Sequence, residues 1–152
     1  MVRPGHSAGF TIIEMIVAVG VLCIVIALAA PALSGMIATQ QVRSASQDVY
    51  ASLTIARSEA LTRNTSVTVE PLLGDWAKGW TVTDAGGTVL RRQEAYPRVT
   101  LSGPVRVVFN GDGRPDSIAT PFSFAATNLD AGDYRCVRLR LNGRSAISSG
   151  GC

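Results

Sequence analysis

The feature that most constrains this chain is an uncharged apolar run near its N-terminus. Residues 15–33, MIVAVGVLCIVIALAAPAL, contain no charged or strongly polar side chain. As an α-helix the run would be about 28 Å long, which is close to the hydrocarbon core of a bilayer at roughly 30 Å. The run therefore predicts a membrane-spanning helix, although Gly20 and Pro31 are poor helix residues.

The composition outside this run is different. Hydrophobic residues make up 47% and charged residues 16% of the 152 residues, and much of the apolar excess lies within the run. Beyond residue 40 the chain is polar and rich in glycine. A chain of this length has room for one modest domain plus a leader or anchor. We therefore predict a helical anchor followed by a single soluble domain.

A second helical pattern follows the apolar run. Residues 39–63 repeat small and apolar side chains at steps of three and four, the spacing of one helix face. This face consists of Val42, Ala45, Val49, Leu53, Ala56 and Ala60. We predict one long helix over residues 10–63, apolar on all sides in its first half and on one side in its second. Pro31 should bend or loosen it, because proline removes a backbone hydrogen bond.

After Asn64 the sequence changes to short β-type runs separated by Gly, Pro and Asp. The runs are 66–70, 79–83, 88–91, 99–101, 105–109, 121–125, 134–141 and 144–147. They predict a β-rich domain. Within the run 134–141 the side chains alternate, so that Val137, Leu139 and Leu141 should share one face.

Two turn signals lie among these runs. Asn142-Gly143 precedes the last run and is typical of a β-hairpin. Residues 110–115, NGDGRP, resemble a calcium loop, but the remaining ligands and the distal Glu of a calcium-binding helix-loop-helix are missing. We therefore predict a plain turn at that position.

Few residues could support catalysis. The only histidine is His6, so a chain without its first nine residues would have no histidine-based triad or metal site. The sequence has no Gly-rich phosphate loop and no metal-spaced cysteine pair. Pairs of Asp occur near turns, but turns collect Asp for backbone reasons. We predict that the chain is not an enzyme and needs no cofactor and no metal.

The three cysteines occupy different settings. Cys23 lies inside the apolar run and is expected to pack as a small hydrophobic residue. Cys136 and Cys152 lie in the polar region near the C-terminus, which predicts a disulfide and an oxidising compartment. In the loop-entropy model such a link would contribute roughly 3 kcal/mol of stability.

One charge, Glu14, lies at the start of the apolar helix, and the residues alone allow two explanations. Residues 11–14, TIIE, fit a capping box, and a carboxylate in the first turn suits the helix dipole. Alternatively, residues 15–26 form the core of a secretory signal that is cleaved at the small residues 27–29. A glutamate directly before such a core is unusual, and the helical pattern continues beyond the cut.

A third explanation comes from a resemblance. Residues 9–14, GFTIIE, follow a short leader with Arg3 and precede an apolar run. This arrangement resembles the class III signal of type IV pilins and type II secretion pseudopilins. The resemblance implies that prepilin peptidase cuts between Gly9 and Phe10 on the cytoplasmic side, and that Phe10 is then N-methylated. Pro31 matches a helix-loosening proline that pilins commonly carry.

The resemblance also implies an assembly role for Glu14. A carboxylate near a bilayer costs a few kcal/mol unless it is neutralised or paired. In the family, this glutamate of an incoming subunit pairs with the N-terminal amine of a neighbour already in the fibre. The cost would then be offset only in the assembled state, so the pair would both drive and align assembly.

Two further segments resemble the GspH/FimT/FimU branch of the pilin-like proteins. Residues 48–67, DVYASLTIARSEALTRNTSV, are similar to the end of that branch's helix, and residues 138–147, RLRLNGRSAI, to its closing strand pair. Residues 71–130 contain no motif that suggests a family resemblance. The resemblance implies an α+β fold with a long N-terminal helix packed on an antiparallel β-sheet domain. On the residues alone, 56–60 (ARSEA) are interpreted as a solvated helix turn packed by its alanines.

Arginines near the C-terminus make DNA a candidate partner, because some FimT-like members bind DNA. Arg138, Arg140 and Arg144 could contact phosphates through charge and bidentate hydrogen bonds. The alternative is that they keep an exposed sheet edge soluble. DNA-binding members carry Gly-Arg-x-Arg, whereas residues 143–146 here are GRSA and lack the second arginine.

These features together predict a minor type IV pilin that takes part in pilus assembly, by priming it or near the fibre tip. The alternatives are a GspH-like minor pseudopilin of a type II secretion system and a FimT-like DNA-binding minor pilin. The expected location is the bacterial inner membrane, with the C-terminal domain in the periplasm, and then the fibre. The expected partners are other pilins or pseudopilins, prepilin peptidase and the membrane, with DNA as a further candidate.

The prediction divides the chain into four parts. Residues 1–9 are the prepilin leader, and residues 10–38 are the transmembrane and polymerisation helix. Residues 39–64 are the amphipathic half of the helix, and residues 65–152 are a periplasmic β-rich domain.

Overall fold

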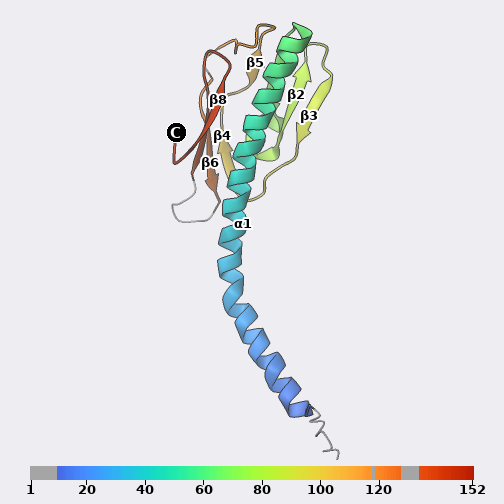
Figure 1. Ribbon diagram of the computed structural model, residues 1–152, viewed down its shortest axis with the longest axis vertical. Helices are drawn as coiled ribbons and strands as arrows, with labels where there is room; N and C mark the ends of the chain where they lie inside the picture. The colour runs from blue at the N-terminus through green and yellow to red at the C-terminus, as the bar shows by residue number, and fades with distance from the viewer. Residues whose placement is uncertain (1–9, 118, 128–133) are drawn as a thin grey trace, which may run out of the picture. The chain divides into compact units, whose positions relative to one another are not determined.

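The computed structural model describes residues 10–117, 119–127 and 134–152, without the side chains of residues 29–34 (Figure 1). The predicted leader and the side chain of Pro31 therefore lie outside the described residues. In the described part, one long helix is followed by eight strands. The chain divides into two compact units, Met1–Met36 and Ile37–Cys152, and each is described by itself.

The first unit contains the N-terminal half of helix α1 (Ile12–Arg63). Thr11 caps this helix, because its Oγ1 accepts a hydrogen bond from the Glu14 backbone nitrogen at 3.3 Å. The side chains of residues 10–28 are exposed throughout. Where side chains are described, no helical stretch is both long enough and apolar enough to cross a membrane.

The second half of α1 belongs to the unit Ile37–Cys152 and buries one face. Its buried apolar side chains are Ala38, Val42, Ala45, Val49, Leu53, Ala56 and Ala60, each at most 4% exposed. The three- and four-residue spacing of the sequence predicts all of them except Ala38, so the amphipathic pattern is confirmed. The helix ends at Arg63, and Asn64 follows with φ 49°, a left-handed conformation common after helix ends.

Two four-stranded antiparallel sheets form the rest of this unit. The first has the order β3-β2-β1-β5 and consists of β1 (Val67–Pro71), β2 (Trp80–Asp84), β3 (Val89–Gln93) and β5 (Val107–Phe109). The second has the order β4-β6-β7-β8 and consists of β4 (Val99–Ser102), β6 (Phe122–Ala126), β7 (Arg135–Leu139) and β8 (Ser145–Ser149). Two short 3-10 turns, η1 (Leu72–Gly74) and η2 (Trp76–Lys78), lie between β1 and β2. Each strand overlaps one predicted run, and the predicted α+β fold is confirmed.

One hydrophobic core joins the second half of α1 to both sheets. Figure 1 shows this half of the helix running alongside the strands. The largest fully buried side chains are Trp80, Phe109, Phe122, Phe124 and Leu53. The indole nitrogen of Trp80 donates a hydrogen bond to Ser52 Oγ at 2.9 Å, so the polar edge of this ring is satisfied by the helix.

Strand β7 is shorter than the run 134–141 that the sequence predicts. It ends at Leu139, and Leu141 lies beyond it with 61% of its surface exposed. The prediction that Leu141 shares one strand face with Val137 and Leu139 is therefore wrong. The physical reason is that the chain has already entered the turn to β8, where strand alternation no longer applies.

Candidate functional site

The residues predicted to act in processing and assembly lie at the start of α1. Gly9 is outside the described residues, and Phe10 lies two residues before the start of the helix with 80% of its surface exposed. Glu14 lies in the first helical turn. Among the described residues, its backbone nitrogen bonds to Thr11, but its carboxylate has no hydrogen bond or ion pair. The capping explanation therefore accounts for Thr11, and among the described residues of this subunit it leaves the Glu14 carboxylate without a partner.

The first half of α1 exposes apolar side chains on all sides. Ile12 is 83% exposed, Ile13 67% and Leu28 75%. Leaving such surface in water costs about 25 cal/mol per Å². A helix that is apolar all round needs a hydrophobic environment, which a membrane or other protein chains can supply.

The two C-terminal cysteines form the predicted disulfide. Cys136 in β7 is bonded to Cys152, with their Cα atoms 5.2 Å apart. Cys136 is fully buried. The link holds the segment after β8 against the second sheet, where the Cys152 sulfur also lies 3.2 Å from the Phe122 carbonyl oxygen. Cys23, by contrast, is a free and exposed thiol.

The three predicted DNA-contacting arginines all lie on or beside the β7–β8 hairpin, and all three are exposed. Arg138, on β7, donates a hydrogen bond to the main-chain carbonyl of Cys152 at 3.3 Å. Arg140 and Arg144 are exposed at the two ends of the β7–β8 turn. Arg144 also lines a polar groove.

The β7–β8 turn has a different form from the one that Asn-Gly most often indicates. The nitrogen of Gly143 donates to the Arg140 carbonyl at 2.8 Å, and the nitrogen of Arg140 to the Arg144 carbonyl at 2.9 Å. Gly143 has φ 75°, whereas Asn142 does not have a positive φ. A two-residue I′ turn needs positive φ at both central positions, so this hairpin instead closes through a glycine bulge. The hairpin itself is confirmed.

The segment NGDGRP folds in the same way and forms the predicted turn. The nitrogen of Gly113 donates to the Asn110 carbonyl at 2.8 Å, the nitrogen of Asn110 donates to the Arg114 carbonyl at 2.9 Å, and Gly113 has φ 71°. In each turn the residue before the glycine, Asp112 or Asn142, accepts a hydrogen bond from the arginine nitrogen at 3.1 Å. The chain therefore contains two similar turns of sequence Asx-Gly-Arg.

These two turns meet at one side chain of helix α1. Arg57 Nε donates a hydrogen bond to the Gly113 carbonyl at 3.1 Å. A Cβ atom on Gly143 would lie 2.0 Å from that same carbonyl oxygen and 2.9 Å from Arg57 Nε. Glycine is therefore required at position 143 both for its left-handed backbone and for this close approach.

A polar groove lies between α1 and the β7–β8 turn. It has a volume of about 390 Å³, and it is lined by Tyr50, Thr54, Arg57, Gly143, Arg144 and Ser145. The three helix residues follow each other at steps of four and three, so they lie on one face of α1. Sequence reasoning missed Arg57 as a member of this site, although the repeated Asx-Gly-Arg triplet is a signal from which the paired turns could have been found.

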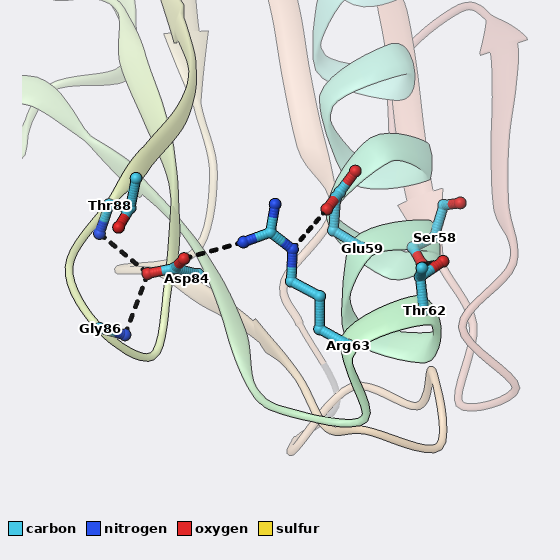
Figure 2. Close-up of polar contacts among 7 residues, drawn as sticks. All are labelled: Ser58, Glu59, Thr62, Arg63, Asp84, Gly86 and Thr88. Atoms are coloured by element: carbon cyan, nitrogen blue, oxygen red, sulfur yellow. Dashed lines mark hydrogen bonds and ion pairs between the residues drawn. The ribbon is translucent and has the colours of Figure 1, made fainter.

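The helix end is fixed to the first sheet by a polar network (Figure 2). Arg63 pairs with Glu59 on its own helix at 2.7 Å and with Asp84 Oδ2 at 3.0 Å. Asp84 Oδ1 accepts hydrogen bonds from the backbone nitrogens of Gly86 and Thr88, at 3.0 and 2.8 Å, and so shapes the β2–β3 turn. The predicted packing of residues 56–60 by alanines is confirmed, since Ala56 and Ala60 are fully buried, but this helix turn also carries tertiary polar contacts.

A second polar cluster links the helix to β3 and the segment after it. Asp48 pairs with Arg91 at 3.0 Å and accepts a hydrogen bond from the hydroxyl of Tyr96. Gln93 Nε2 donates to the same hydroxyl at 3.0 Å. Burial, followed by the hydrogen bond to Asp48 and the charge of that carboxylate, raises the pKa of Tyr96 well above its ordinary value. The cluster holds the sheet on the helix, and the phenol is neutral there.

Comparison with solved structures gives the fold. The chain resembles the type IV minor pilin FimU of Pseudomonas aeruginosa PAO1 in two crystal forms. In the first the TM-score is 0.62 at 21% identity, over 72% of this chain and 89% of FimU. In the second it is 0.60 at 22% identity, over 70% of this chain and 91% of FimU. These identities support a shared fold and no more.

Comparison with family profiles gives the family. The profile of the family described as "Type II transport protein GspH" matches residues 45–144, and that of the "Prokaryotic N-terminal methylation motif" matches residues 5–30. No curated protein sequence matches the chain closely enough to count as a relative. The GspH match covers well over half of the chain and includes the end of α1, the whole first sheet, strands β4, β6 and β7 of the second sheet, and both Asx-Gly-Arg turns. The chain therefore belongs to the GspH family, as a GspH/FimT/FimU-type pilin-like protein with a class III signal.

Proposed function

We propose that this chain is a minor type IV pilin, a structural subunit and not an enzyme, that takes part in assembling a pilus by priming it or near its tip. The observation that carries the proposal is the start of α1. There an exposed apolar helix, matched by the N-terminal methylation motif, presents a Glu14 carboxylate that has no partner among the described residues of its own subunit. A neighbouring subunit can supply both the apolar contacts and the missing cation.

The proposed maturation gives that cation. Prepilin peptidase removes residues 1–9 and leaves a free amine on Phe10, which is then N-methylated and remains protonated at neutral pH. This amine lies at the same end of α1 as Glu14, so the two groups of neighbouring subunits can pair at one depth in a fibre. The apolar helix 10–38 anchors the subunit in the inner membrane before assembly, and the domain 65–152 lies in the periplasm.

Substitution of Glu14 tests this proposal in cells that produce the fibre. Glu14→Ala should be processed and inserted normally, but it should be lost from sheared fibres, because it has no carboxylate to pair with the N-terminal amine of a neighbouring subunit. Thr11→Ala is the matched control, since it removes the helix cap and keeps the carboxylate. If Thr11→Ala is lost from fibres and Glu14→Ala is retained, capping explains the motif and the assembly role is wrong.

A second candidate is a minor pseudopilin of a type II secretion system, which is favoured by the match to a family described as a type II transport protein. Both candidates use the same signal and the same helix, so a deletion strain separates them. Loss of surface pili with normal protein secretion supports the pilin. Loss of secretion with normal pili supports the pseudopilin.

A further inference from the structure

The groove between α1 and the β7–β8 turn contains two arginines that are not neutralised. Among the described residues, the only hydrogen bond from the Arg57 side chain goes from Nε to a main-chain carbonyl, and the Arg144 guanidinium has no partner. The described arginines outside the groove include four that pair with carboxylates: Arg63, Arg91, Arg92 and Arg114. Two like charges that line one groove repel each other, and an anion between them would relieve that repulsion.

Arg57 is also held in position before any ligand arrives. Its Nε is fixed to the Gly113 carbonyl at 3.1 Å, and the backbone of Gly143 packs directly against its side chain. The two terminal nitrogens of the guanidinium group are left for other acceptors. A side chain that is already ordered loses less conformational entropy on binding, so this arrangement suits recognition of a planar acceptor such as a carboxylate.

The remaining lining residues add contacts suited to a peptide. Thr54 and Ser145 carry hydroxyl groups on the two walls of the groove, and Tyr50 is 39% exposed at the helix wall. A tyrosine with an accessible ring gives contact area at low entropic cost. The Thr54 hydroxyl already donates to the Tyr50 carbonyl at 2.9 Å and can accept a further bond, whereas the Ser145 hydroxyl can donate or accept.

We propose that this groove binds an acidic segment of a neighbouring fibre subunit, with Arg57 and Arg144 pairing with its carboxylate. The inference rests on the proposed function, because it requires the chain to be in a fibre. A protein segment is favoured over nucleic acid because only two arginines line the groove, while Arg138 is bonded to Cys152. Binding to a nucleic acid backbone depends on several phosphate contacts along a cationic track.

The test uses the full chain in cells that assemble the fibre. Thr54, an exposed lining residue, is replaced by the photo-crosslinking amino acid p-benzoylphenylalanine, and covalent adducts are identified by mass spectrometry. The expected adduct joins Thr54 to an acidic segment of another pilin. Arg144→Glu should reduce the adduct at least about tenfold, because it replaces an attraction with a repulsion. Arg114→Glu, at the matching position of the other Asx-Gly-Arg turn, should leave it unchanged.

A second crosslinker, at Val17 in the exposed apolar half of α1, reports separately on fibre entry. If the Val17 adduct forms and the Thr54 adduct does not, the groove proposal fails and the pilin proposal stands. If neither forms, the chain does not enter a fibre and both fail. A nuclease-sensitive Thr54 adduct, or one that Arg144→Glu leaves intact, overturns the acidic-segment proposal. If an acidic residue of the identified partner is changed to arginine and the Thr54 adduct of the Arg144→Glu variant then forms again, the acidic-segment proposal is supported.

Discussion

Arg57 Nε donates a hydrogen bond to the main-chain carbonyl of Gly113 at 3.1 Å, and so ties helix α1 to a turn 56 positions further along the chain. The second Asx-Gly-Arg turn packs against the same contact through Gly143. One helix side chain therefore fixes the relative positions of two turns from different sheets. Because Arg144 directly follows Gly143, this contact also positions one wall of the polar groove.

Gly143→Ala should disturb this junction. The new Cβ would lie 2.0 Å from the Gly113 carbonyl oxygen on a residue with φ 75°, so overpacking adds to backbone strain. We expect the free energy of unfolding to fall by about 3 kcal/mol. Tryptophan fluorescence during urea unfolding of the full chain in detergent micelles measures the loss, since Trp76 and Trp80 are both buried.

Gly150→Ala is the matched control. Gly150 also has a positive φ, 93°, but a Cβ there would meet nothing within 4 Å. Gly150→Ala should lower the free energy of unfolding by about 1 kcal/mol, because only backbone strain acts there. Equal losses for the two variants would show that the close approach at Gly143 has no energetic role.

Asp84 is expected to stabilise the β2–β3 turn more through the turn nitrogens than through Arg63. Asp84→Ala removes the acceptor for Gly86 and Thr88 as well as the ion pair, and should lower the free energy of unfolding by about 2 kcal/mol. Asp84→Asn keeps an oxygen for the turn and loses only the charge, so about 0.5 kcal/mol is expected for a pair with a 41% exposed arginine. The two variants are compared by urea unfolding. If both lower the free energy of unfolding by a similar amount, Asp84 stabilises the fold mainly through its ion pair with Arg63.

Reduction of the Cys136–Cys152 disulfide should destabilise the β-domain. The bond joins residues 16 positions apart, and in the loop-entropy model its loss costs about 3 kcal/mol. Thermal unfolding with and without dithiothreitol measures the effect, and Cys152→Ser should reproduce it without reductant. Cys23→Ser is the control, because that thiol is free and exposed. An unchanged melting temperature on reduction would contradict the prediction.

The raised pKa of Tyr96 should make the free energy of unfolding fall at alkaline pH. Its pKa is raised in the folded state, so the folded protein retains the phenol proton at a pH where the unfolded chain has lost it. The resulting contribution to stability is fully present below the ordinary pKa near 10 and is lost as pH rises above it toward the folded-state value. Unfolding free energies at about pH 9 and pH 11 should therefore fall less steeply for Tyr96→Phe than for the natural chain. Parallel declines would show that Tyr96 is not the group responsible.

The sequence was sufficient for the parts of the fold that depend on local periodicity. Val42 to Ala60 recur at helical spacing because one face packs on the sheets, and each of the eight β-type runs overlaps an observed strand. The cysteine pair was also predictable, since both lie in the polar region. Leu141 was misplaced because alternation does not reveal where a strand gives way to its turn.

The candidate groove was not predictable from local pattern. The sequence around Arg57 does not indicate that its side chain contacts Gly113, because that hydrogen bond depends on how two distant turns pack together. The order of strands in the two sheets is likewise set by long-range pairing, as between β1 and β5. The motif around Glu14, by contrast, could be predicted from the sequence alone, because its residues are contiguous.

The most direct test of the account is the intact mass of the mature chain in sheared fibres. Prepilin peptidase cleavage and N-methylation predict a single species that begins at Phe10 and carries one extra methyl group on its N-terminal amine. A species that begins at Ala30, as signal peptidase cleavage would leave, or an uncleaved chain that begins at Met1, would contradict it.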